Sequence, residues 1–214
     1  MPLLLKEELA PTVRLGLWQI SEQTSDFLCR FSQLEVVAQR YKNEGRRLQK
    51  LAAYALLYAM TGDEGAVIKH DERGKPLLNL SRDFFFTPQG RAMKNLQISV
   101  SDTKGFVAIM LGERRVGVDI EYMSDRVARV ASRFMREDEL VTSIEAMLVH
   151  WSAKETVYKY FSEEDLLYNE MRLAPFTLQN EGIVETDNLK SGLRIPVVYR
   201  VSKDYVLTYA FQNS

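Results

Sequence analysis

The sequence V-G-V-D-I-E at residues 116–121 alternates apolar and polar letters along its whole length. Successive side chains of a strand point to opposite faces, so this pattern predicts a β-strand with two valines and an isoleucine facing a core. The other face then carries Asp119 and Glu121 side by side. Neighbouring carboxylates raise each other's pKa unless a cation lies between them, and such oxygen ligands suit a hard ion such as Mg2+. A solvated acidic face is the simpler interpretation.

The segment 144–160 contains neither Gly nor Pro and has a broken apolar stripe, which is typical of a helix. This helix would carry Lys154, Glu155 and Lys159. The last two stand four residues apart in the order that helices favour, so a surface ion pair is the simpler interpretation. His150, on the same segment, is interpreted as a packed or surface residue.

The two segments together are more specific than either alone. G-V-D-I-E at 117–121 followed by W-S-A-K-E-T-V-Y-K at 151–159 resembles the motifs of the 4′-phosphopantetheinyl transferase superfamily. The resemblance is to its two-halved, single-chain, surfactin-synthetase-activating type, and it is densest over residues 74–159. It implies transfer of the phosphopantetheine arm of coenzyme A to a serine of an acyl- or peptidyl-carrier protein.

The resemblance also implies roles for individual residues. The carboxylates of the family's two motifs bind Mg2+, which corresponds here to Asp119, Glu121 and Glu155, with Mn2+ as an alternative ion. The two lysines of the second motif, Lys154 and Lys159, would lie near the phosphates of coenzyme A. A metal and two lysines together would neutralise the pyrophosphate during phosphoryl-type transfer.

A base must take the proton of the carrier serine, and two glutamates are candidates. The family has an acidic residue after a turn resembling R-F-M at 133–135, and Glu139 corresponds to it. Glu155 is the other candidate, acting directly or through a metal-bound water. We therefore expect catalytic roles for Glu155, Glu139 and Lys159, and the sequence does not choose between the two bases.

Two upstream segments extend the resemblance. G-K-P at 74–76 places Lys75 at the entrance of a strand, and S-V-S-D-T-K-G at 99–105 resembles the family's S-H-[ST] segment, with Ser101 as a substrate contact. The phosphate-contacting histidine of the family falls on Asp102. An aspartate there would repel a pyrophosphate unless it is turned away, protonated, used as a metal ligand, or paired with a cation such as Lys104.

A helix is predicted from about residue 43, with Arg46 and Arg47 in its first turn. Cations at a helix N-terminus oppose the helix dipole, so a nearby anion would explain them. Glu44 is the simpler candidate, and a phosphate of coenzyme A is the functional one.

The composition is that of a globular protein of one large or two small domains, with 214 residues and 46% hydrophobic content. Its 28 basic and 29 acidic residues give no support to a nucleic-acid partner. The single cysteine, Cys29, fits a reducing compartment. The apolar start at residues 1–5 is too short for a signal peptide or a membrane span. We expect a cytoplasmic monomer without a membrane partner.

Strand and helix patterns recur without the regular alternation of a doubly wound sheet, which predicts an α+β fold. Besides 116–121, predicted strands cover 13–20, 67–70, 76–80, 98–101, 106–111, 176–178, 195–201 and 205–211. Residues 27–37 predict a helix, a further helix follows residue 124, and 81–95 resemble an insertion.

The resemblance implies two similar halves related by pseudo-twofold symmetry, each with a small, mostly antiparallel sheet and packed helices. Residues 1–111 would contact the coenzyme A phosphates, and residues 112–214 would hold the metal and catalytic motifs. Asp102 favours the alternative function, a catalytically weakened family member that binds coenzyme A or a carrier protein. A metal-dependent phosphohydrolase is a third interpretation, with fewer matching motifs.

Overall fold

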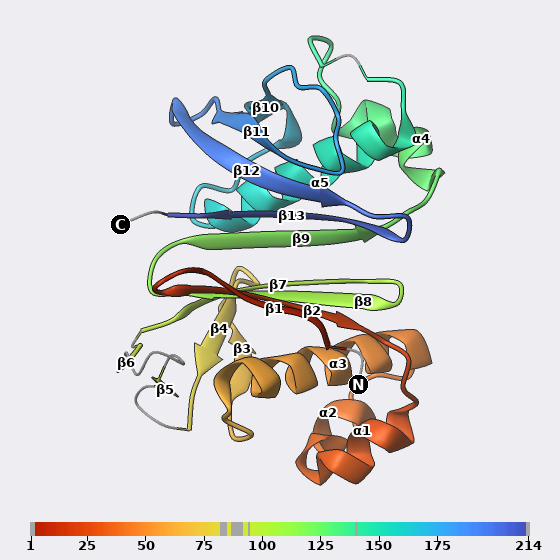
Figure 1. Ribbon diagram of the computed structural model, residues 1–214, viewed down its shortest axis with the longest axis vertical. Helices are drawn as coiled ribbons and strands as arrows, with labels where there is room; N and C mark the ends of the chain where they lie inside the picture. Colours follow the sequence, from red (N-terminus) through yellow and green to blue (C-terminus); the bar gives the residue numbers. More distant parts are fainter. Residues whose placement is uncertain (1–2, 82–84, 87–91, 94, 140, 213–214) are drawn as a thin grey trace. The chain divides into compact units, whose positions relative to one another are not determined.

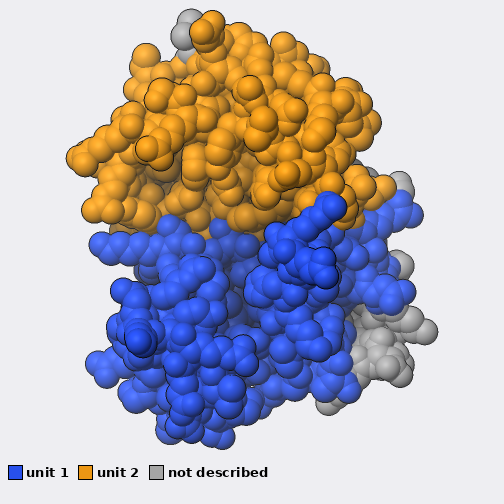
Figure 2. Space-filling view, turned by 180° about the vertical axis from the view of Figure 1, so that it is seen from behind, with its two compact units in different colours: residues 1–114 blue, residues 115–214 orange. Residues whose placement is uncertain are grey.

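The computed structural model describes residues 3–81, 85–86, 92–93, 95–139 and 141–212. The chain forms two compact units, Met1–Arg114 and Arg115–Ser214, which Figure 2 colours blue and orange. Each unit combines an antiparallel sheet with helices, so the predicted α+β class is confirmed. The pseudo-twofold relation between the halves stays a prediction.

The first unit is built on a four-stranded antiparallel sheet against which one long helix packs (Figure 1). The strands lie in the order β1 (Leu3–Ala10), β2 (Val13–Gln19), β8 (Phe106–Gly112) and β7 (Gln97–Thr103). The helix is α3 (Glu44–Thr61), and its leucines and alanines meet Val107 and Ile109 of the central strand in the core. The other elements of this unit are α1 (Thr24–Arg30), η1 (Ser32–Leu34), α2 (Glu35–Gln39), β3 (Val67–His70), β4 (Pro76–Asn79), β5 (Phe85–Phe86) and β6 (Ala92–Met93).

Local signals fix both ends of α3. The Asn43 side chain accepts a hydrogen bond from the Arg46 backbone N–H, which satisfies one of the free donors of the first turn. Gly62 ends the helix in the left-handed conformation, with φ of 67°. The start expected near residue 43 follows from this cap.

The second unit is built on a five-stranded antiparallel sheet with one long helix on one face (Figure 1). The strands lie in the order β10 (Met171–Leu173), β11 (Glu181–Asn188), β12 (Leu193–Val201), β13 (Tyr205–Phe211) and β9 (Val116–Tyr122). The helix is α5 (Ile144–Tyr160), capped by the Ser143 side chain. The remaining elements are α4 (Arg126–Val130), η2 (Ala131–Arg133) and η3 (Tyr168–Glu170).

Several predicted elements differ from the structure. The helix expected over 27–37 is divided into α1, η1 and α2. Residues 176–178 belong to no strand, whereas β1 and β11 form strands that the sequence did not predict. Of the expected insertion at 81–95, residues 82–84, 87–91 and 94 lie outside the described residues.

Among the residues that the structure describes, no helix combines the length and apolar character needed to cross a bilayer.

Candidate metal and catalytic site

The acidic face of β9 is turned toward α5. Gly117 shares this face, and a Cβ atom on it would collide with the backbone carbonyl oxygen of Thr156 and crowd Tyr160. Glycine therefore allows the helix to lie close to the strand. Asp119 follows on the same face and is only 4% exposed. The interpretation of a solvated acidic face does not hold for Asp119, because α5 covers it.

Two donors from α5 bind the Asp119 carboxylate. The Lys159 ammonium donates to Oδ1 at 2.7 Å and to the carbonyl oxygen of Val118 at 3.1 Å. The Ser152 hydroxyl donates to Oδ2 at 2.8 Å. Lys159 thus pairs across the helix–strand contact with Asp119, instead of forming the helical pair with Glu155 that the spacing suggested.

The two glutamates of the candidate metal site are held by aromatic side chains. The Trp151 indole N–H donates to Glu121 Oε1 at 2.8 Å, and the Tyr168 hydroxyl donates to Glu155 Oε1 at 2.6 Å. The ring centroids of Trp151 and Tyr168 lie 5.3 Å apart. From the sequence, Trp151 had no assigned role of its own, although it begins the W-S-A-K-E-T-V-Y-K motif. Tyr168 was missed, because it lies on η3 beyond the motif.

Asp119 and Glu121 are both bound by side chains of α5, the helix that also carries Glu155. Burial and then the negative charge of Asp119 raise the pKa of Glu121 to about 7, and Glu155 contributes to the same shift. Burial and then Asp119 also raise the pKa of Glu155. Because a nearby cation would relieve this repulsion, the donor set fits a hard divalent ion such as Mg2+.

The side chains are not arranged around an ion as they stand. Within the described residues, no group of three or more Asp, Glu, His or Cys side chains is placed to hold a metal. Protein donors occupy an oxygen of each carboxylate: Lys159 and Ser152 on Asp119, and the two aromatic donors on the glutamates. The carboxylates that a metal ion would need are therefore present, but in this structure their oxygens bind protein donors.

Lys154 and Glu139 form a buried ion pair. The Lys154 side chain is fully buried, and its ammonium donates to Glu139 Oε2 at 2.6 Å and to the Phe134 carbonyl oxygen at 2.7 Å. Glu139 Oε1 accepts from the Leu173 backbone N–H at 2.7 Å. Burial lowers the pKa of Lys154, and the bond to Glu139 opposes that shift.

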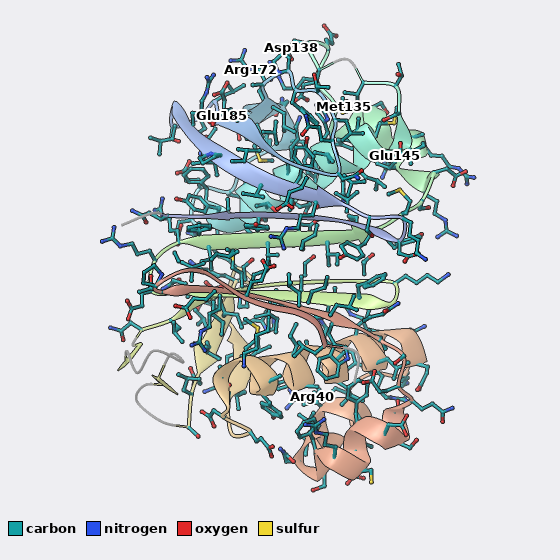
Figure 3. All side chains as sticks on the ribbon, viewed as in Figure 1. Arg40, Met135, Asp138, Glu145, Arg172 and Glu185 are labelled. Carbon is teal, nitrogen blue, oxygen red and sulfur yellow. The ribbon has the colours of Figure 1, made fainter. Side chains whose placement is uncertain are left out.

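This ion pair joins α5 to β10 and to the loop that leads to Glu139. Figure 3 labels two residues of that loop, Met135 and Asp138. The sequence predicted a phosphate contact for Lys154 and a catalytic role for Glu139. Both roles stay predictions; in the structure the ammonium has no exposed surface and the carboxylate is bound on both oxygens. Their contacts are those of a structural pair.

Comparison with known families adds one observation, and it concerns this second unit. The model of the 4′-phosphopantetheinyl transferase superfamily matches residues 115–210. The matched segment contains β9, α5 and all three carboxylates, so the match supports the superfamily and the transferase class that the motifs implied. No curated protein matches the chain.

The other residues expected to contact coenzyme A, besides Lys154 and Lys159, lie in the first unit. Asp102, at the family's histidine position, accepts from Arg46 at 2.6 Å and from Lys50 at 2.7 Å. Its side chain is 8% exposed, whereas that of Arg46 is 52% exposed. Asp102 is therefore paired with two cations of α3, where the sequence suggested Lys104. Lys50 was missed, although it stands one helical turn after Arg46.

Arg47 has a structural place in the same unit. It donates to the carbonyl oxygens of Ala38 at 3.2 Å and Tyr41 at 3.1 Å, and to the carboxylate of Glu44. The sequence suggested two anions that could explain the cations at this helix start. The structure pairs Arg47 with the simpler one, Glu44. Its guanidinium also ties α3 to the end of α2.

Ser101 and Lys75 are the last two predicted contacts, and their backbone positions do not place them beside Asp102 and its two cations. In β7, Ile98 and Val100 pack toward the core beside α3, so Asp102 shares their face and Ser101 lies on the opposite one. Lys75 follows the turn between β3 and β4, where its backbone N–H donates to Asp71.

Proposed function

We propose that this protein transfers the 4′-phosphopantetheine arm of coenzyme A to a serine of an acyl- or peptidyl-carrier protein, in a Mg2+-dependent reaction. The observation that carries the proposal is that side chains of α5, the helix that carries Glu155, bind Asp119 and Glu121 of β9, within the segment matched to the transferase superfamily. The two-halved subtype, a monomeric state and the cytoplasm are part of the same proposal.

The reaction exchanges one phosphorus–oxygen bond for another. The serine oxygen forms a bond to the phosphorus that carries pantetheine, and the bond from that phosphorus to the bridging oxygen breaks. The leaving group is 3′,5′-adenosine bisphosphate, and the serine proton passes to a base. Mg2+ held by Asp119, Glu121 and Glu155 would supply charge neutralisation of the pyrophosphate.

The chain's own residues support particular steps. Glu155 is our candidate for the base, because Glu139 is already bound by Lys154 and by the Leu173 backbone N–H. Lys159 donates a charge-assisted hydrogen bond to Asp119 Oδ1 at 2.7 Å, which holds that carboxylate in place. We also propose that Lys159, whose side chain is partly exposed, adds positive charge near the pyrophosphate.

In the first unit, Arg46 is our leading candidate for a coenzyme A phosphate contact, because its guanidinium is half exposed. Lys75 and Ser101 stay in the proposal as further contacts. We do not include Arg47 and Lys154 among the proposed phosphate contacts. Arg47 already donates to two backbone carbonyl oxygens, and Lys154 already donates to the buried carboxylate of Glu139.

Mass spectrometry of apo carrier proteins tests the proposal. Incubation with the protein, coenzyme A and Mg2+ should add one phosphopantetheine mass to a carrier, and chelation of the metal should prevent it. Asp119→Ala should also prevent it, while Glu35→Gln on an exposed turn of α2 should not. A panel of acyl- and peptidyl-carriers left unmodified by the wild-type protein would contradict the transferase proposal.

A second candidate function rests on Asp102. Because its carboxylate offsets one of the two positive charges of Arg46 and Lys50, the first unit offers less positive charge to a polyanion than the sequence suggested. A protein that binds coenzyme A without transferring its arm would fit that arrangement. Calorimetry that detects coenzyme A binding, together with unmodified carriers in the assay above, would favour this candidate.

A further inference from the structure

Tyr168 is fixed by three contacts, although it lies outside the motifs that identify the site. Its backbone carbonyl oxygen accepts from the Lys154 ammonium at 3.4 Å. Its ring lies against Trp151, with centroids 5.3 Å apart. Its hydroxyl donates to Glu155 Oε1 at 2.6 Å. Backbone, ring and hydroxyl are thus each held by a residue of α5.

The partners of Tyr168 are themselves held in place. Lys154 is bound by Glu139 in the interior, and Trp151 packs edge-on against Phe134 with centroids 5.1 Å apart. The buried pair of Lys154 and Glu139 is therefore linked to Glu155 through Tyr168 as well as through the helix backbone. A donor whose own position is fixed restricts the orientations of the carboxylate that it binds.

We infer that Tyr168 is a positioning residue that fixes Glu155 by one carboxylate oxygen and leaves the other oxygen to bind a divalent cation. The inference rests on the proposed function, because it takes Glu155 as a metal ligand. The hydroxyl occupies one carboxylate oxygen, Oε1, and so directs the binding of an ion to the other oxygen, Oε2. Trp151 holds Glu121 through one oxygen in the same way, so two adjacent rings orient two carboxylates.

The test is calorimetric titration of Mn2+ into the metal-free protein, without coenzyme A. Tyr168→Phe keeps the ring and removes the hydroxyl, and it should weaken Mn2+ binding about tenfold, the lower end for loss of a group that orients a ligand. The matched control is Tyr158→Phe, because Tyr158 lies on α5 and its side chain is 40% exposed. That variant should bind Mn2+ like the wild type.

A double variant separates positioning from a general structural effect. In a Glu155→Ala background, Tyr168→Phe should cause no further loss of Mn2+ affinity, since the carboxylate on which it acts is gone. An equal loss in both backgrounds would overturn the inference, as would a Tyr168→Phe protein that binds Mn2+ like the wild type. This comparison also decides the matter if Tyr168→Phe lowers the thermal stability.

The same titration distinguishes failure of the inference from failure of the proposed function. A wild-type protein that binds no Mn2+ would overturn the metal assignment and the inference with it. Wild-type binding that is lost in Asp119→Ala and unchanged in Tyr168→Phe would overturn the inference alone.

Discussion

At the scale of single residues, Asp102 decides how much positive charge the first unit presents. Replacing it with asparagine should remove one negative charge while keeping the side-chain shape, and leave Arg46 and Lys50 available to a phosphate. We expect Asp102→Asn to strengthen coenzyme A binding by about 1 kcal/mol, roughly a fivefold change, as for a partly exposed charge pair. Isothermal titration calorimetry measures it.

Asp102→His extends that comparison, because an imidazole adds an N–H donor at the position to which the sequence resemblance assigns a histidine. It should bind coenzyme A at least as tightly as Asp102→Asn and show higher transfer activity than the wild type. Weaker binding in both variants would instead indicate that Asp102 is needed to hold Arg46 and Lys50 in place.

The buried ion pair of Lys154 and Glu139 contributes to the free energy of unfolding, and this contribution can be measured. Lys154→Met would leave the Glu139 carboxylate without its cation in the interior, and we expect unfolding to become easier by about 3–5 kcal/mol. Urea denaturation checks this. The double variant Lys154→Met, Glu139→Gln should recover part of the loss, because the buried charge is then removed. A loss below about 1 kcal/mol in the single variant would be inconsistent with a fully buried pair.

At the scale of elements, the approach of α5 to β9 depends on Gly117. Gly117→Ala would place a methyl group against a backbone carbonyl of α5, which has no freedom to move aside as a side chain does. The expected destabilisation is about 1–3 kcal/mol, as in other overpacked cores. Thermal denaturation measures it. Gly45→Ala in α3 is the matched control, since its nearest neighbour is 3.4 Å away, and its stability should not fall.

The elements that the sequence predicted well carry strong local signals. β9 has strict alternation, and α5 has a long run without Gly or Pro, so both lie close to their predicted ranges. β1 and β11 were missed because neither shows strict alternation of apolar and polar residues. Their pairing with β2 and β12 makes them strands. Phe176 was read as part of a strand, but its ring packs between His150 and Tyr199 from an irregular segment.

The candidate site could be predicted only in part, because several of its contacts join residues that no local sequence pattern links. Asp119 and Glu121 follow from alternation, and their proximity to Glu155 follows from the family motif. The burial of Lys154 could not be predicted, because a lysine next to a glutamate on a helix is usually exposed. The cations on Asp102 come from a helix far away in the sequence, and no local pattern links them.

At the scale of the whole molecule, His150 contributes a pH dependence of stability. Burial lowers the pKa of His150, so the folded protein keeps the imidazole neutral where an unfolded chain, with a pKa near 6.5, takes up a proton. The unfolded state then binds more protons, and stability must fall as the pH drops below about 6.5 toward the folded-state pKa. Above 6.5 this contribution is fully present.

Urea denaturation of the wild type and His150→Phe between pH 5.5 and 7.5 measures this contribution. The wild type should lose stability toward the acidic end more steeply than the variant, whose phenylalanine does not titrate. The comparison cancels the contributions of the carboxylates, which both proteins share. Parallel curves would show that His150 is protonated equally well in the folded and unfolded states.

The bond from the Trp151 indole to Glu121 gives this protein an internal optical reporter. Indole emission responds to the charge and hydrogen bonding of its N–H group, so any cation that draws Glu121 away will change the light that Trp151 emits. The chain has one other tryptophan, Trp18, which is buried in the first unit, so a folded Trp18→Phe protein would emit from Trp151 alone. Stopped-flow mixing of that single-tryptophan protein with Mg2+ would then record how fast the ion enters and leaves, without any added dye.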